Sequence, residues 1–267
     1  MKVIKDNSKI KVLQGTYLEF VEYAKTQPRS KRAESEDSLD SERGSLKFTA
    51  TKNIDEALNY AEKGWDSGIK QLKLSEGVLV SGKGMEVNQN VLGSLVNIGN
   101  YVQGLPDNMY EFTELRDYNL EPLNVYVRLN YSARNSSEKA LKYTKFLIEK
   151  INDYQRTNAI KIIGFFDSDQ NSKRLLTEVL IKDLDEKMVI NNISFAFHPS
   201  FFRRLYFKHI ESEEFLDYFG YGRPCSRDKT LSYLKSKESQ FVFLPNLNDL
   251  ADDFTEEQFN SNILENA

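Results

Sequence analysis

The chain has 267 residues, of which 40% are hydrophobic and 12% aromatic, so it is long enough for one large domain or two small ones and should fold. Its 36 basic and 40 acidic residues give a net charge of −4, which argues against a whole-protein electrostatic grip on nucleic acid. The single cysteine, Cys225, excludes an intramolecular disulfide and favours a reducing compartment.

The sequence gives no sign of a membrane partner. Its N-terminal stretch lacks the continuous apolar segment of a secretory signal, and no apolar run approaches the roughly 20 residues that span a bilayer. We therefore expect a protein of the cytoplasm.

The first elements are a helix and a loop. Residues 16–25 have the pattern of a short amphipathic helix. Residues 27–45 are rich in serine and in charges of both signs, and they contain almost no large apolar side chain. Such a segment cannot bury enough surface to offset its ordering entropy, so the sequence predicts a mobile loop.

A second helix begins after Asn53. Asn53 and Glu56 form a capping-box pattern, and Gly64 is a typical helix stop. The only tryptophan, Trp65, follows that stop and is expected to anchor the helix end by packing. Residues 69–74 read as a strand.

The glycine-rich region 75–112 reads as loops and short helices, without the spacing of a phosphate-binding loop. The pattern then becomes regular. Residues 123–130 alternate as in a strand, residues 135–155 form a long amphipathic helix that opens with a capping box, and residues 159–166 are the apolar strand that follows.

The C-terminal part is also predicted to contain both strands and helices. Residues 177–184 and 240–247 read as strands, a helix is expected to start near Pro199, and residues 255–266 read as a last helix.

These elements predict an α/β fold. A strand, a helix and a second strand in succession indicate a right-handed crossover and a parallel pair. We therefore expect a mainly parallel sheet with flanking helices and a β-hairpin in residues 120–267. Residues 1–119 are expected to form a smaller α+β portion.

Two aspartates suggest either a metal site or a turn. Asp167 and Asp169 follow the strand at 159–166, as carboxylates that hold Mg²⁺ can do. The segment resembles the second acidic motif of the Toprim fold, in which Glu76 would be the general acid/base. However, Ser172 stands where that motif has glycine, Glu76 is far away in the chain, and the residues between the strands are typical of a hairpin. The sequence favours the hairpin.

Three segments resemble an uncharacterised family of tailed-phage and prophage proteins. The first resembles "FTGT-x-S-x-EEA" followed by Gly-Trp, the second "G-x-P-x-x-M", and the third "His-Pro-x-x-x-Arg-Arg". The matching residues are Phe48, Thr49, Thr51, Glu56, Ala57, Gly64, Trp65, Gly104, Pro106, Met109, His198, Pro199, Arg203 and Arg204. The resemblance implies a phage or prophage origin, and hence the host cytoplasm or the virion, but no chemistry.

The second half also resembles a von Willebrand factor A-type sheet in the order of its elements. That fold binds a metal through Asp-x-Ser-x-Ser after its first strand, where this chain has Asn130 and Arg134 in place of the aspartate and the last serine. The resemblance is therefore used for topology alone.

The remaining candidates are binding residues. Arg203 and Arg204 lie in an aromatic segment, where they either pair inside the core or grip an anionic partner, and His198 is either a helix-entry residue or part of that surface. Together with Trp65 they are the expected binding residues. No catalytic residue, metal site or cofactor is predicted.

We therefore expect a non-enzymatic binding protein that acts in particle assembly or as a host- or DNA-directed accessory factor. Its partner would be another protein or a second copy, with nucleic acid as a further class. The alternative is a Mg²⁺-dependent phosphoryl-transfer enzyme of Toprim type that uses Glu76, Asp167 and Asp169.

Overall fold

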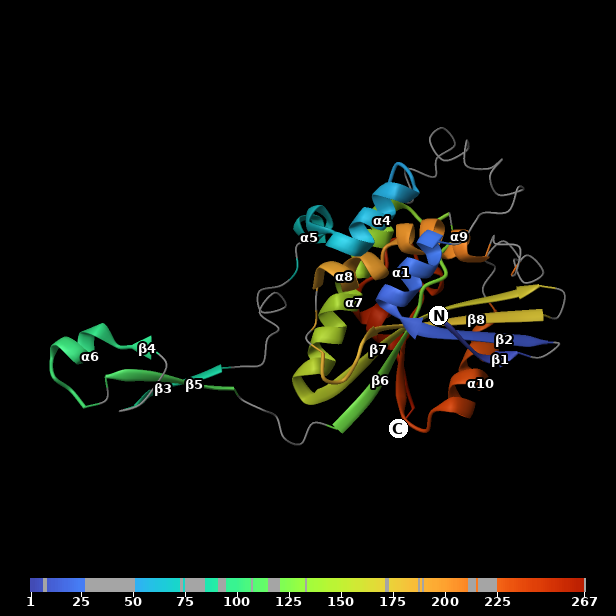
Figure 1. Cartoon of the computed structure of the whole chain (residues 1–267). Helices are drawn as coiled ribbons and strands as arrows, with labels where there is room; N and C mark the ends of the chain where they lie inside the picture. Colours follow the sequence, from blue (N-terminus) through green and yellow to red (C-terminus); the bar gives the residue numbers. More distant parts are fainter. Residues whose placement is uncertain are drawn as a thin grey trace. The chain divides into compact units, whose positions relative to one another are not determined.

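The structure of the protein is a computed structural model (Figure 1). It describes residues 1–6, 9–26, 51–72, 74, 85–90, 95–106, 108–114, 121–132, 134–170, 173–186, 188, 190–210, 215 and 225–266. The predicted mobile loop at 27–45 and Glu76 lie outside the described residues. The chain forms two compact units, one made of Met1–Leu79 and Glu121–Ala267, the other of Val80–Leu120.

A seven-stranded sheet organises the larger unit. Its order is β1-β2-β8-β7-β6-β9-β10. The strands are β1 (Lys2–Asp6), β2 (Ile10–Thr16), β6 (Glu121–Arg128), β7 (Asn158–Gln170), β8 (Lys173–Lys182), β9 (Phe241–Leu244) and β10 (Leu264–Asn266).

The predicted α/β class is confirmed, but the prediction of a mainly parallel sheet is wrong. The pairs β2–β8, β6–β7 and β6–β9 are parallel, whereas β1–β2, β7–β8 and β9–β10 are antiparallel. The sheet is mixed because the chain reverses within it at β7–β8 and closes each edge with an antiparallel strand.

The predicted hairpin after Asp167 is confirmed. β7 and β8 pair antiparallel from Ile162 opposite Lys182 to Gln170 opposite Lys173. The residues that follow the two aspartates therefore return along the sheet.

The two faces of the sheet bury different cores because side chains alternate along each strand. Val125, Val127 and Ile162 point into the large core, which is covered by helices from before and after β6 in the chain. These are α1 (Tyr17–Thr26), α4 (Ile54–Lys63), α5 (Asp66–Leu72), α7 (Ser137–Thr157), α8 (Ile190–Ala196), a π-helical segment (Phe201–Tyr206), α9 (Phe207–Ile210) and α11 (Glu256–Ser261).

The opposite face carries a small core under one helix, α10 (Arg227–Lys237) (Figure 1). Tyr126, Phe165 and Phe243 from three adjacent strands pack there with Leu234 of α10. A short 3₁₀ turn, Leu247–Asp249, follows β9.

The predicted caps of the two secure helices are close to those observed. Asn53 Oδ1 accepts the Glu56 N–H at 2.9 Å, and Gly64 ends α4 with φ = 93°. The long helix α7 is capped by Ser136, one residue later than predicted, whose hydroxyl accepts the Lys139 N–H at 3.1 Å.

The helix predicted to start near Pro199 is confirmed: helical residues begin at Pro199 and continue into the π-helical segment and α9, after the separate helix α8. Two other local predictions are wrong. Residues 69–74 do not form a strand, because α5 runs through Leu72. The last helix is shorter than predicted, and the chain ends in β10 beside β9.

The smaller unit is a three-stranded antiparallel sheet, β3 (Met85–Asn90), β5 (Met109–Glu114) and β4 (Leu95–Val96), with β5 in the middle. Its helix α6 (Ile98–Val102) lies between β4 and β5 in the chain. In the described part of both units, no helix is both long and apolar enough to cross a bilayer.

Candidate functional site

The polar groups of the larger unit converge where β6, β7 and β9 end. β6 pairs with β7 on one side and with β9 on the other, both in parallel. The helix after β6, α7, packs on the large core, whereas the helix before β9, α10, packs on the small one. The strand order thus reverses at β6, and α/β proteins commonly bind ligands at the carboxyl ends of strands at such a point.

Asp167 is the centre of a buried ion cluster at this edge. Its Oδ1 accepts two hydrogen bonds from the Arg128 guanidinium, at 3.0 Å from Nε and 2.8 Å from Nη2. Its Oδ2 accepts the Thr230 hydroxyl of α10 at 2.5 Å, and its backbone N–H donates to Asn130 Oδ1 at 2.9 Å. The Asp167 side chain is fully buried, so these partners replace water around it.

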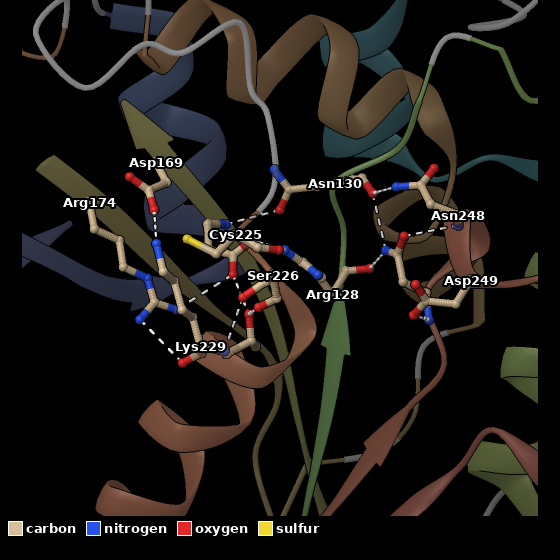
Figure 2. A network of polar contacts seen from close by, with 12 residues as sticks. Arg128, Asn130, Asp169, Arg174, Cys225, Ser226, Lys229, Asn248 and Asp249 are labelled. Atoms are coloured by element: carbon tan, nitrogen blue, oxygen red, sulfur yellow. Dashed lines mark hydrogen bonds and ion pairs between the residues drawn. The ribbon is translucent and has the colours of Figure 1, made fainter. Parts of the chain in front are cut away.

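A second arginine shares the same carboxylate. Arg174 Nη2 lies 3.6 Å from Asp167 Oδ2, and Arg174 Nη1 donates to the Lys229 carbonyl at 3.4 Å. Lys229 Nζ in turn pairs with Asp169 at 2.6 Å (Figure 2). One buried carboxylate therefore lies between two guanidinium groups, while Asp169 has its own cation nearer the surface.

Asparagine side chains join the loops after β6 and β9. Asn246 Nδ2 donates to the carbonyls of Arg128 and Asn130, and Asn248 Nδ2 donates to the Asn130 carbonyl at 3.0 Å. Asn248 Oδ1 accepts the Ser132 N–H at 2.8 Å. These amides satisfy backbone groups that the sheet leaves unpaired at its end.

Cys225 belongs to the same edge as a structural residue. Its carbonyl accepts a hydrogen bond from Arg128 Nη2, and its side chain is buried. Burial, reinforced by Asp167, raises the pKa of the thiol to about 11. The thiol therefore stays protonated at neutral pH, which makes it a poor nucleophile.

Asp167 and Asp169, which the alternative interpretation assigned to a metal site, are brought to one edge, but each is paired with a cation. Within the described residues, no three His, Cys, Asp or Glu side chains are grouped so as to hold a metal ion. The arrangement is a densely hydrogen-bonded, preorganised polar edge.

Trp65 and His198 lie together inside the larger unit. Their ring centroids are 4.4 Å apart, and both side chains are buried. His198 Nδ1 accepts the Ser200 N–H at 3.2 Å, and burial lowers the pKa of the imidazole to about 3. The ring is therefore neutral and positions the turn before the π-helical segment.

The two arginines of that segment have different surroundings. Arg204 is buried and donates to the carbonyl of Thr51 at 2.7 Å and to its hydroxyl at 3.3 Å. Arg203 is half-buried, with its guanidinium 4.3 Å from the centroid of the Phe207 ring. Of the four predicted binding residues, only Arg203 reaches the surface.

An exposed apolar surface in the smaller unit was missed by the sequence reasoning. Five large apolar side chains on and beside α6 are exposed to solvent. They are Val96 (48% exposed), Ile98 (74%), Tyr101 (65%), Val102 (78%) and Leu105 (43%). Ile98, Tyr101 and Val102 have the i, i+3, i+4 spacing of one helix face, a signal that was available in the sequence. We call these five residues the α6 stripe.

A family model described as "Domain of unknown function (DUF7192)" matches residues 11–266. The chain belongs to this family. The matched range covers the polar edge and the α6 stripe alike, so both lie within the DUF7192 domain. Neither the curated proteins nor the solved structures contain a match to the chain.

Proposed function

We propose that this chain is a non-enzymatic, phage-encoded binding protein that works by self-association in particle assembly. The observation that carries the proposal is the α6 stripe. The origin rests on the resemblance of three sequence segments to phage and prophage proteins. A host- or DNA-directed accessory role is the other form of a binding function, and the same experiment separates the two.

The α6 stripe needs a covering surface. Soluble proteins rarely leave neighbouring large apolar side chains in water unless they form an interface. Among the side chains that the structure describes in Val80–Leu120, none belongs to a buried core. A unit of this size depends on additional contacts for stability, and a partner surface would supply them.

The stripe is nevertheless held in a defined shape. Asn97 Oδ1 accepts the Asn100 N–H at 3.3 Å at the start of α6. At its end, Gly104 has φ = 67°, and the N–H groups of Gly104 and Leu105 donate to the carbonyls of Tyr101 and Asn100. This is the Schellman arrangement, which stops a helix firmly. Caps at both ends favour a five-residue helix that would be marginal alone.

The charge pattern favours a second copy as the occupant. Residues 87–106 contain no Asp, Glu, Lys, Arg or His, in a chain that is 28% charged. In a two-fold interface the same patch of both copies must be self-complementary, and a charge close to the axis would face its own copy, a like charge. A neutral apolar stripe avoids this repulsion, and burying it removes no charge from water.

The test compares two neighbouring substitutions that add the same charge. Val102 lies on the stripe, whereas Gln103 is exposed beside it. We expect the unmodified chain to dimerise in sedimentation velocity at micromolar concentration. Val102→Asp should weaken the dimer at least about 100-fold, because it places two carboxylates in the apolar contact, and Gln103→Asp should leave it within about threefold.

Three results would contradict self-association: a monomer at every concentration, equal effects of both substitutions, or a dimer that Val102→Asp leaves intact. Mass spectrometry of phage particles and of pull-downs from infected cells then distinguishes the two roles. If the Gln103→Asp variant captures a host protein that the Val102→Asp variant does not capture, the partner of the α6 stripe is that host protein and not a second copy.

A further inference from the structure

A cavity of about 450 Å³ lies in the larger unit, away from the polar edge at β6 and β9. It is found where the parallel strands β2 and β8 end, at Thr16 and Lys182, beside the start of α1. Its volume falls in the range of small-molecule sites, which is about 300–1,000 Å³.

The walls of the cavity are mainly apolar. Leu18, Leu180, Ile181 and Ile193 line it, with Tyr17 beside them. Tyr17 is fixed, because its hydroxyl donates to the Ala61 carbonyl at 3.1 Å and its ring stacks on Phe201. The wall is therefore preformed.

Lys182 also lines the cavity, and its side chain is buried. The residue is 3% exposed, and Nζ donates to the carbonyls of Ile160 and Asp183, both at 2.9 Å. An ammonium group has three N–H donors, so two are used. Among the described residues, no carboxylate oxygen lies within 4 Å of Nζ.

The local backbone explains how the lysine reaches this place. The pairing of β7 with β8 shifts between Ile162 and Ile163, which face Lys182 and Leu180, so Ile181 is an extra residue in β8. Such a bulge redirects the side chains around it and occurs often next to binding sites.

A buried ammonium without a close counter-ion is unfavourable. Burial lowers the pKa of Lys182, while the more distant carboxylates of Glu186, Asp183 and Asp185 act in the opposite direction. A ligand anion beside Nζ would supply the missing counter-charge.

We propose that the cavity binds a small carboxylate with an apolar chain, whose oxygen accepts the third N–H of Lys182 while the chain contacts the leucine and isoleucine side chains. Glu186, which also lines the cavity, uses Oε2 to accept the Asp183 N–H at 2.9 Å. Its charge opposes a bound carboxylate, so it orients the ligand with its carboxylate toward Lys182.

The experiment titrates the full chain with hexanoate, hexanol and hexylamine by isothermal calorimetry or by chemical-shift mapping. We expect a Kd of about 1 mM or tighter for hexanoate, and at least about tenfold weaker binding of the two others. Lys182→Met should weaken hexanoate at least about tenfold, and Glu186→Gln should strengthen it by about twofold to fivefold.

Two further variants keep the test decisive if Lys182→Met does not fold. Leu18 is 67% exposed at the cavity, so Leu18→Trp can obstruct the opening without disturbing the core, and it should abolish binding. The matched control is Lys161→Met, a partly exposed lysine 3.4 Å from Asp183, which should keep the affinity. No binding of hexanoate at about 10 mM, equal binding of hexylamine, or an equal loss in Lys161→Met would overturn the proposal.

Discussion

The Arg128–Asp167–Arg174 cluster makes an asymmetric prediction about stability. Removing one member of a buried ion pair costs about 3–5 kcal/mol, because the other charge is left buried without a partner. In this protein the carboxylate of Asp167 pairs with two cations, whereas among the described residues each arginine is paired with that one carboxylate. Loss of the acid should therefore cost more than loss of Arg128.

The distances give the size of the difference. After Arg128→Met, the Asp167 carboxylate keeps the Thr230 hydroxyl at 2.5 Å and Arg174 at 3.6 Å. Coulomb attraction scales inversely with distance, so Arg174 at 3.6 Å retains roughly three-quarters of the attraction that Arg128 provides at 2.8 Å. We expect Arg128→Met to cost about 3 kcal/mol. Asp167→Asn leaves two buried cations facing each other and should cost about 5 kcal/mol.

The assay is urea unfolding at pH 7, followed by the fluorescence of Trp65. This residue is the only tryptophan of the chain and is buried in the same unit as the ion cluster, so it reports the unfolding of that unit. The matched control is the exposed pair Lys25–Glu62, at 2.9 Å on the surface. Lys25→Met and Glu62→Gln should hardly move the unfolding midpoint, because exposed ion pairs contribute little.

The test depends on the order of the two variants in stability, with Asp167→Asn less stable than Arg128→Met. An Arg128→Met protein as unstable as Asp167→Asn, or an Asp167→Asn protein within about 1 kcal/mol of the unmodified chain, would refute the reasoning. The first result would mean that Arg174 does not share the carboxylate, and the second that Asp167 is not a buried anion.

Three further predictions concern acid, packing and chemistry. Burial lowers the pKa of both His198 and His209 to about 3, so the unfolded chain takes up protons first and stability falls as the pH drops below 6.5. From pH 7 to 5 the loss should be about 2 kcal/mol per histidine, and urea titrations of His209→Phe should show about half the combined loss. Gly68→Ala should destabilise by about 1–3 kcal/mol and change the fluorescence of Trp65, because a Cβ there would lie 2.0 Å from the indole ring. Labelled DNA should stay intact with the protein and Mg²⁺ or Mn²⁺, whereas nicking that Asp167→Asn abolishes would establish the Toprim-type enzyme instead.

Local signals predicted local structure well. The cap of α4 depends on Asn53 and Glu56, three residues apart, and the β7–β8 hairpin depends on the composition of a short turn between two apolar runs. When two interacting residues are only three or four positions apart, both are visible in one short stretch of sequence, and the interaction can be predicted.

Helix α5 was missed because it contains a glycine that propensity alone counts against a helix. Its sequence contains Gly68, which disfavours a helix by about 1 kcal/mol relative to alanine. The structure requires glycine there, since the Trp65 ring lies directly against its Cα position. A residue that weakens the helix as a local signal therefore permits the packing that holds the helix in place.

Helix α10 was missed for a different reason. Only Thr230 and Leu234 of the helix are buried, so its apolar periodicity is faint. Leu231 and Tyr233 are only partly buried against the small core, and polar pairs add to the attachment: Lys229 pairs with Asp169 and Lys237 pairs with Glu178, each about sixty residues away in sequence. The sequence does not indicate which lysine of a helix will pair with which carboxylate of a distant strand.

The same limit explains why two aspartates could be read in two ways. The chemistry of Asp167 is decided by Arg128, 39 residues before it, and by Thr230, 63 residues after it. With neutral residues at positions 128, 174 and 229, the same two carboxylates would lie at a strand end without cations and would be suited to a divalent ion. Because these positions are two arginines and a lysine, the positive charge that a metal would supply is already part of the protein. The Asp-x-Asp pattern therefore needs its long-range partners before it can be assigned to a metal site or to a structural ion cluster.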